Sequence, residues 1–571
     1  MNFARSLCLT LVFASFTAMA CFTPQRSAVL NKSYPDTNFS KMMHEMHSQP
    51  YKGYQFKGVT KCINGKADIY DCHNVDLIGH LNLNEIGGGQ GSDSWGWKDQ
   101  NSGRYFALVG RSNGTSFVEI TDPASPIYLG NLPSPNGTAS AWRDIKTYQN
   151  YAYIVADDIE DHGMQVFDLN QLLNHSGEPK TFSPLLNYRQ QGFQYAHNIH
   201  INEATAYAYI LGANTCAGGL VAVNLNNPSA PEYAGCYAQD GYTHDVQCVI
   251  YTGPDIEHKN KEICFASNED TLTIVDVSNK NNMVYLSRTN YPGAQYVHQG
   301  WLSDDQKHFV LDDELDELAR GGSRPDEART YVMDLTNLDS PNYIGFHKAT
   351  GKSIDHNQYI VNNHSYQANY SEGLRVIHLD NLSQAEMSEV AFFDTHPNNP
   401  AVSNFSGAWN VYPFFDNGMV LVSDINRGIF ILKPNLPPTI NIHSYHTGLW
   451  FNTEQSGHGL SLEVLADNRM AVYWYTYDKD GNQMWLVGTG TFEGNKAILD
   501  VARTSQAMFP PLFNPDDLNT EIWGQFEIEF SDCNNLNFTW FPNQESGFDS
   551  GEMTMTRLTE IPGLSCQNND N

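Results

Sequence analysis

Residues 195–237, YAHNIHINEATAYAYILGANTCAGGLVAVNLNNPSAPEYAGCY, contain the pattern that decides the fold. They divide into four short segments, HNIHI, AYAYILG, GGLVAVNL and PEYAGCY, separated by turn residues. Each segment is rich in the β-branched and aromatic residues that favour strands. Four short antiparallel strands in succession form one blade of a β-propeller.

The same pattern recurs along most of the chain. Seven copies follow one another at intervals of about 40–50 residues, the spacing of four-stranded blades. The segments that begin the copies are DSWGW, SAWRD, YAHNI, YTHDV, YVHQG, SIDHN and SGAWN. A single blade has no core of its own, so the copies must stack around an axis. We therefore predict an all-β chain with a seven-bladed β-propeller over residues 61–435.

One strand is missing from the last copy, because little sequence remains after residue 435. The segment VDLIGHLNL, from Val75, lies before the first copy and has a strand pattern. Pairing the two ends of the chain in one blade would remove two free sheet edges. We expect this segment to complete the seventh blade.

The N-terminus indicates export. Residues 1–20 contain Arg5, the apolar run LCLTLVFASF and a small-residue end, which is typical of a secretory signal. The run is too short to span a membrane in the mature protein. Cleavage before Cys21 fits an ordinary signal peptidase or lipid attachment. The expected location is the outer membrane or cell surface as a lipoprotein, or the extracellular space, with the lipid as the one membrane contact. A polar leader follows at 21–60.

Eight further cysteines predict disulfides in an exported chain. Pairing sequence neighbours gives Cys62–Cys72, Cys216–Cys236, Cys248–Cys264 and Cys533–Cys566. Cys21 is then left for a lipid or for a bond between molecules.

The net charge of −31, from 64 acidic and 33 basic residues, disfavours a nucleic-acid partner. An acidic surface suits solubility, a salty exterior or divalent cations.

Several strings, including NVDLIGHLNLNEIGGGQGSDSWGW, GYTHDVQC, SNEDTLTIVDVSN and QANYSEGLRVIHL, resemble the choice-of-anchor B family, which is built on LVIVD repeats. The resemblance covers about residues 60–435. It implies an exported propeller displayed on bacterial surfaces, without an established activity.

The first strand of each blade lines the central channel, and the loop between its second and third strands reaches the same rim. The residues that we expect at one equivalent position are Trp95, Trp142, His197, His244, His298, His356 and Trp409. Histidine is the commonest transition-metal ligand, so this rim is a candidate copper or zinc site, with the tryptophans as binding neighbours. The alternative is that these residues only hydrogen-bond adjacent blades and fill the channel.

Carboxylates accompany the histidines. DDELDE, with Asp312 and Asp313, offers oxygens to calcium, although a solvated acidic loop is the favoured interpretation because the spacing of an EF-hand is missing. Asp144 and Asp245 stand beside rim residues and are expected to orient a histidine. His162 is expected to reach the same rim.

After a linker at 436–440, residues 441–566 show hairpin patterns such as MAVYWYTYD and MWLVGTGTFEG around a KDGNQ turn. They predict a small antiparallel sandwich or barrel, followed by a tail at 567–571. The segment resembles the GLW-type domain of secreted proteobacterial proteins. Its tryptophans are expected mainly in the core, with a sugar-stacking face as the alternative.

The sequence contains no nucleophile elbow, zinc-protease helix or phosphate-binding loop. We expect an exported binding protein with a metal or small ligand at the histidine rim and a surface polysaccharide, protein or small molecule as partner. The alternative is a metal-dependent oxidoreductase or hydrolase at that rim, and a third option is a pure scaffold. A pocket beside the histidines would favour an enzyme, and a plugged channel a scaffold.

Overall fold

The computed structural model describes residues 54–175, 177–321, 327–397, 405–436 and 442–564. The predicted signal, Cys21, most of the leader and the linker, Cys566 and the tail lie outside these residues. In the described part of the chain, no helix combines the length and the apolar character needed to cross a bilayer.

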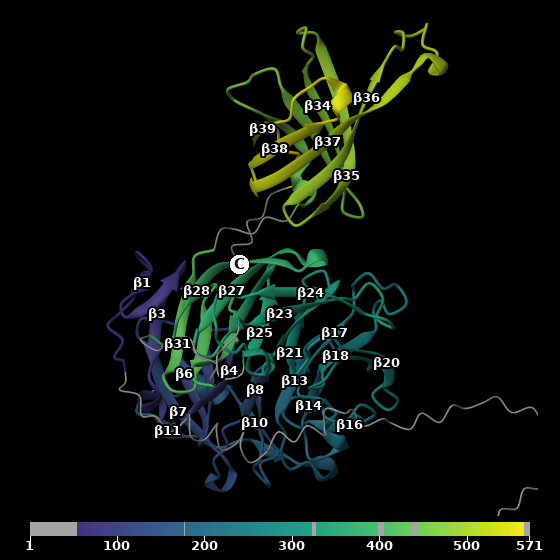
Figure 1. Cartoon of the computed structure of the whole chain (residues 1–571). Coiled ribbons are helices and arrows are strands. Elements are labelled where there is room, and N and C mark those ends of the chain that lie inside the picture. The colour runs from purple at the N-terminus through teal and green to yellow at the C-terminus, as the bar shows by residue number, and fades with distance from the viewer. Residues whose placement is uncertain (1–53, 176, 322–326, 398–404, 437–441, 565–571) are drawn as a thin grey trace, which may run out of the picture. The chain divides into compact units, whose positions relative to one another are not determined.

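The described residues form seven four-stranded antiparallel blades around one axis (Figure 1). In chain order these are β4 (Gly91–Lys98), β5 (Tyr105–Arg111), β6 (Gly114–Glu119), β7 (Ile127–Pro133); β8 (Arg143–Tyr148), β9 (Tyr151–Ala156), β10 (Met164–Asp168), β12 (Leu186–Tyr188); β13 (Asn198–Asn202), β14 (Tyr207–Leu211), β15 (Leu220–Asn224), β16 (Glu232–Tyr237); β17 (Asp245–Ile250), β18 (Glu262–Ser267), β19 (Leu272–Asp276), β20 (Val284–Thr289); β21 (Val297–Leu302), β22 (His308–Asp313), β23 (Arg329–Asp334), β24 (Asn342–Lys348); β25 (Asn357–Val361), β26 (His364–Ala368), β27 (Leu374–Asn381), β28 (Glu386–Phe393); and β29 (Ala408–Tyr412), β30 (Val420–Asp424), β31 (Gly428–Pro434) with β3 (Val75–Leu81).

The seventh blade is closed by the early strand, as predicted. β3 pairs antiparallel with β31 from Val75 opposite Pro434 to Leu81 opposite Ile429. The inner strands β4, β8, β13, β17, β21, β25 and β29 each contact the next in a complete ring. Joining both ends of the propeller in one sheet removes two free edges and fixes the ring.

Short edge strands extend two blades. β11 (Lys180–Thr181) pairs parallel with β7, and α2 (Asn170–Leu173) precedes it. β1 (Lys66–Ala67) and β2 (Tyr70–His73) extend the sixth blade through β28.

Apolar residues of neighbouring blades pack face to face, as the alternation along each strand predicts. One cluster joins the first two blades and contains Phe117, Phe167 and Phe182. The Phe117 and Phe167 rings stack with centroids 4.4 Å apart. Such layers bury the blade faces that a single blade would expose.

Three predicted disulfides are present, namely Cys62–Cys72, Cys216–Cys236 and Cys248–Cys264. Cys533 is also disulfide-bonded, whereas its predicted partner Cys566 lies outside the described residues. Disulfides persist in oxidising compartments, so the chain has the chemistry of an extracellular or periplasmic protein.

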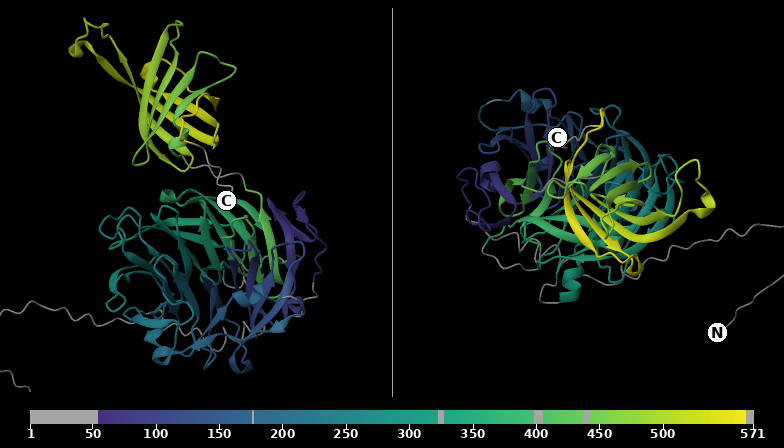
Figure 2. Two further views of the ribbon diagram at one scale, coloured as in Figure 1. Left: turned by 180° about the vertical axis from the view of Figure 1, so that it is seen from behind. Right: turned by 90° about the horizontal axis from the view of Figure 1, so that it is seen from above.

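The C-terminal strands form a closed antiparallel barrel, in the described residues β32 (Gly448–Phe451), β33 (Gly459–Leu465), β34 (Arg469–Tyr477), β35 (Gln483–Glu493), β36 (Lys496–Ser505), β37 (Asn519–Asp532), β38 (Asn535–Pro542) and β39 (Gly551–Arg557). β32 pairs with both β33 and β39, which closes the barrel. The paired ends of β36 and β37 extend beyond it as a two-stranded arm (Figure 2).

The barrel interior is apolar. Trp450, Trp474 and Trp523 are at most 5% exposed and belong to its core, as predicted for most of these tryptophans. Trp540 is partly buried against this core, and Trp485 is 47% exposed. On the described barrel, Trp485 lies directly opposite Tyr475, which is 51% exposed.

Candidate functional site

One repeated contact defines a ring of equivalent residues at the start of the inner strands. The side chain of each donor bonds the backbone carbonyl of the equivalent residue in the next blade: Ser92 Oγ to Arg143 (3.2 Å), His244 Nδ1 to His298 (2.9 Å), His298 Nδ1 to His356 (2.8 Å) and His356 Nδ1 to Trp409 (2.5 Å). These contacts place Ser92, Arg143, His244, His298, His356 and Trp409 in the rim ring, and His197, whose ring centroid lies 4.5 Å from that of His244, completes it.

Two predicted members are misplaced. Trp142 is one residue before the true ring residue Arg143, although it still lines the same cavity. Trp95 is three residues beyond Ser92, and its ring packs on Tyr412 with centroids 4.9 Å apart. Matching tryptophan to tryptophan gave the wrong register in these two blades. The four histidines and Trp409 were placed correctly.

The four imidazoles follow one another around the rim. Ring centroids are 4.5 Å apart for His197 and His244, 4.2 Å for His244 and His298, and 4.4 Å for His298 and His356. In His244, His298 and His356, Nδ1 carries the proton that the neighbouring backbone carbonyl accepts. In the neutral imidazole Nε2 therefore carries the lone pair. The fold thus fixes one tautomer three times.

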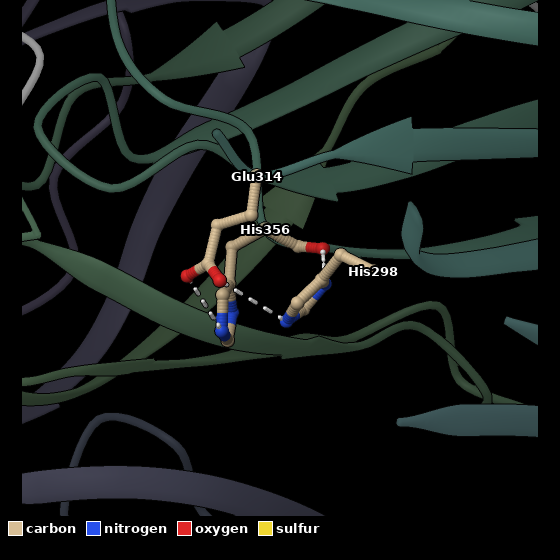
Figure 3. Close-up of side chains that lie close together, drawn as sticks. All are labelled: His298, Glu314 and His356. Carbon is tan, nitrogen blue, oxygen red and sulfur yellow. Dashed lines mark hydrogen bonds and ion pairs between the residues drawn. The ribbon is translucent and has the colours of Figure 1, made fainter. Parts of the chain in front are cut away.

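Glu314 completes a cluster with two of these rings (Figure 3). Its Oε2 lies 3.8 Å from Nε2 of His298, and its Oε1 lies 3.7 Å from Nε2 of His356. One ligand atom from each of the three residues falls within 4.8 Å of the others, and all three side chains are buried. Tyr370 donates its hydroxyl to Oε1 of Glu314 at 2.6 Å and holds the carboxylate in place.

Burial governs the charge of this cluster. It lowers the pKa of His356 to about 3 and lowers the pKa values of His244 and His298 well below the ordinary value, so these rings are neutral at pH 7. Burial also raises the pKa of Glu314 to about 7, against the opposing bond from Tyr370. Neutral imidazoles and one carboxylate form the donor set of many zinc and copper sites.

The segment DDELDE is not a solvated loop. Asp312 and Asp313 end β22, and α3 (Asp316–Gly321) follows directly. Asp312 Oδ1 lies 3.2 Å from Nδ1 of His298 and so supports that ring from behind. Asp313 accepts hydrogen bonds from the hydroxyl of Tyr291 and from the backbone N–H groups of Gln295 and Tyr296, each at 2.7 Å. The structure therefore turns Glu314, rather than Asp312 or Asp313, toward the imidazole Nε2 atoms.

His197 differs from the other ring histidines. Its Nδ1 lies 3.0 Å from Oδ2 of Asp157, in the loop after β9, and the two side chains are 16% and 19% exposed. Burial lowers the pKa of His197, but the bond and charge of Asp157 outweigh it and the pKa lies above the ordinary value. The pair therefore carries a protonated or easily protonated imidazole at the open side of the rim.

Asp144 and Asp245 do not orient histidines. Asp144 accepts from the backbone of Ile199 at 2.8 Å and from Lys146 at 2.5 Å. Asp245 accepts from Asn198 at 2.9 Å. These carboxylates tie neighbouring inner strands together, and burial raises the pKa of Asp245 to about 7.

His162 is buried behind the rim. Its Nε2 lies 3.0 Å from Nη1 of Arg143, and burial lowers its pKa to about 3, so it acts as the acceptor for that guanidinium.

The rim encloses a small cavity that ends in an aromatic plug. Its volume is about 30 Å³, and the ring residues from Arg143 to Trp409 line it together with Trp142, Asp144 and Asp245. Below it, Trp301 packs on Tyr359 and Phe414, with centroids 4.9 and 6.1 Å away. This volume holds an ion and one or two waters, whereas a drug-sized organic ligand needs a cavity of about 300 Å³.

Comparisons with known proteins identify the repeat. Residues 263–290, which cover β18 to β20, match the model of the LVIVD repeat. No curated protein matches the chain.

The chain is similar to several solved structures at low identity. The computationally designed Ika8 protein is 10% identical, with 67% of this chain and 98% of that chain covered and a TM-score of 0.38. A functionally unknown protein from Desulfotomaculum acetoxidans is 10% identical, with 58% and 95% covered and a TM-score of 0.36. PorZ, a surface component of the type-IX secretion system of Porphyromonas gingivalis, is 9% identical, with 85% and 64% covered and a TM-score of 0.40. Similarity at this level assigns no function.

Proposed function

We propose that the propeller binds one transition-metal ion, zinc or copper, through Nε2 of His298, Nε2 of His356 and the carboxylate of Glu314. The observation that carries this proposal is the tautomer of His298 and His356, in which Nδ1 carries the proton. Nδ1 of both rings donates to a backbone carbonyl, which directs a lone pair on each Nε2 toward one shared carboxylate. Metal-binding histidines are commonly held by such a bond on their other nitrogen.

The spacing supports the same assignment. Two ligands about 2.1 Å from a tetrahedral zinc ion lie about 3.4 Å apart. The observed separations of 3.7 and 3.8 Å between Glu314 and the two rings exceed this by a few tenths of an ångström. Their Nε2 atoms are too far from the carboxylate for a direct hydrogen bond, which leaves room for an ion between them.

The role of the bound ion is recognition at the cell exterior. The disulfides fit an exported protein, and the signal-like N-terminus with Cys21 fits a lipid anchor at the outer membrane. Under this proposal the chain is a choice-of-anchor B protein with a GLW-type domain. The metal at the rim then binds a small molecule or an exposed group of a surface polysaccharide or protein, and a nucleic acid is not the partner.

Metal content tests this proposal. We expect about one zinc or copper per chain by elemental analysis of protein purified from the exported fraction or reloaded after chelation. The double variant His298→Ala, His356→Ala should lose that metal and remain folded by circular dichroism. His308→Gln is the control, because His308 is buried on β22 in the blade of His298 but lies outside the rim. Equal metal in the double variant, or none in the wild type after reloading, would overturn the proposal.

The alternative function, a metal-dependent hydrolase or oxidoreductase, is favoured by one observation. His197 and Asp157 form an imidazole–carboxylate pair beside the metal-binding cluster and on its open side, where a general acid or base would act. The test compares the metal-loaded wild type with His197→Gln on small ester and phosphoester substrates. Turnover that requires both the metal and His197 would establish an enzyme, and none leaves the binding role.

A further inference from the structure

The outer wall of the barrel carries exposed aromatic side chains on two neighbouring strands, β34 and β35 (Figure 1). Side chains of β34 alternate between the core and solvent, and Tyr473, Tyr475 and Tyr477 take outward positions. Trp485 of β35 also points outward and lies directly opposite Tyr475. Tyr475 is 51% exposed, Trp485 47% and Tyr477 40%. We call these four residues the aromatic platform.

The four rings are close enough to act together. Residues directly opposite each other on antiparallel strands, as Tyr475 and Trp485 are, have Cβ atoms about 4.5–5.5 Å apart. Tyr473 is diagonal to Trp485, and their ring centroids are 6.4 Å apart. His458 packs on Tyr477 with centroids 5.4 Å apart and ring planes at 82°, which helps to hold that ring in place. The platform is therefore one contiguous surface.

The neighbouring strands leave the platform uncovered. On the β33 side Gly459 is opposite Tyr475, and a glycine has no side chain to place over that ring. On the other side β36 pairs with β35 only from Val487 onwards, so Trp485 has no paired residue on β36. Single exposed apolar residues are ordinary, whereas contiguous exposed patches mark interaction and ligand-binding sites.

The chemistry of the platform matches a sugar. The other outward positions beside its rings carry no charge, namely Gly459, Ser461, Gln483 and Val487. Each tyrosine adds a hydroxyl and Trp485 adds an indole N–H, so flat apolar faces lie beside hydrogen-bonding groups. A sugar ring has the complementary surface, because its C–H groups form an apolar face and its hydroxyls surround that face.

The size and the charge of the surface limit the other occupants. A stable protein interface engages about 20–30 residues on each side. The platform has four rings, and exposed charged residues such as Glu463, Lys479 and Asp480 border it. The net charge of the chain, −31, disfavours an acidic polymer.

We propose that the aromatic platform binds a neutral polysaccharide, whose sugar rings stack on Tyr475 and Trp485. The hydroxyls of the tyrosines and the side chains of Ser461 and Gln483 bond the sugar hydroxyls at the edges of the rings. This site belongs to the barrel and does not depend on the metal ion proposed at the propeller rim.

The test is affinity electrophoresis of the full chain in gels that contain hydroxyethylcellulose, laminarin or galactomannan, which are neutral, or alginate, which is acidic. At least one neutral polysaccharide should retard the wild type, and alginate should not. Tyr475→Ala with Trp485→Ala should weaken the binding by about tenfold or more, because two stacking surfaces are lost. Phe541→Ala, which removes a ring that is 45% exposed on β38, is the matched control and should bind like the wild type.

Folding and site identity are checked separately. Tyr475 and Trp485 are exposed, so the double variant should keep the thermal midpoint of the wild type, and Trp485→Phe, which keeps a flat ring, should retain most of the binding. His298→Ala with His356→Ala should bind the polysaccharide like the wild type, which distinguishes the platform from the rim.

Two kinds of result would overturn the proposal. One is a wild type that none of the three neutral polysaccharides retards, or equal retardation of the Tyr475 and Trp485 double variant. The other is a wild-type dimer in sedimentation velocity that the double variant converts to a monomer, because the platform would then bind a second copy of this chain.

Discussion

The propeller axis and the barrel interior are both buried, but they are built from different residues. Around the axis, histidines, Glu314 and Lys146 are removed from water at a considerable cost in free energy. The barrel core instead consists almost entirely of aromatic and aliphatic side chains such as Trp523 and Phe526. Buried polar groups that packing alone would not require are typical of functional sites, so we place the proposed site at the propeller rim and assign the barrel interior a structural role.

The largest predicted effect is a loss of stability confined to the barrel. Trp523→Ala removes a side chain that is 2% exposed and should lower the free energy of unfolding by about 3–5 kcal/mol. Trp485→Ala, at a position that is 47% exposed, is the matched control and should cost far less. Urea unfolding followed by circular dichroism measures both. A loss of rim metal in folded Trp523→Ala protein would contradict the assignment of a purely structural role.

Removing a propeller cross-link should have a somewhat smaller effect. Cys248 and Cys264 lie directly opposite each other on β17 and β18, with 16 residues of separation. Replacing both with alanine frees a loop of this length and should cost about 3 kcal/mol. The same urea experiment, compared with reduced wild-type protein, measures it. Stability equal to that of the oxidised wild type would show that the cross-link is dispensable.

Acid should destabilise the barrel through one buried histidine. Burial lowers the pKa of His446 to about 3, helped by the charge of Arg557. The unfolded chain takes up a proton near pH 6.5, while the folded barrel does not until about pH 3. Stability is therefore fully present above pH 6.5 and falls by up to about 1.4 kcal/mol per pH unit below it. His446→Gln should remove about one proton from this dependence, measured by urea unfolding between pH 7 and 5. An unchanged slope would contradict the burial argument.

The smallest effect concerns the support of the proposed metal ligand Glu314. Tyr370→Phe removes the 2.6 Å hydrogen bond to Glu314 and keeps the ring. Loss of such a supporting contact typically weakens metal binding by about 10–100-fold, and we expect the lower end because two imidazoles remain. Competition with a chelating dye measures the affinity. Tyr366→Phe, on β26 just before Tyr370 in the chain, is the control. Equal affinities in both variants would mean that Tyr370 does not support the site.

The fold followed from the sequence because the blade pattern recurs. The closing strand was also predictable, since the seventh copy lacked one. The rim register was predictable only in part. In every blade an Asp, Asn or Gln follows the ring position, as in Asp93, Asp144 and Asn198, and aligning these residues would have selected Ser92 and Arg143. Aligning Trp95 and Trp142 with Trp409 instead placed the ring position wrongly in the first two blades.

Glu314 could not be selected from the sequence, although it lies within the quoted acidic segment. Five acids occur in DDELDE, and the choice among them depends on where β22 ends and on an irregular register between β21 and β22 near Val297. The burial of the segment was not predictable either, because its composition is that of a solvated loop. Asp312 accepts a hydrogen bond from Gln358 of β25, and Glu314 accepts one from Tyr370.

The most direct test of the proposed metal site at the rim is a crystal structure of zinc- or copper-loaded protein with anomalous scattering data collected at the absorption edge of the metal. We predict one strong anomalous peak about 2.0–2.2 Å from Nε2 of His298, from Nε2 of His356 and from a carboxylate oxygen of Glu314. Loaded protein without a peak between these three side chains, or with Nδ1 facing the ion, would contradict the account.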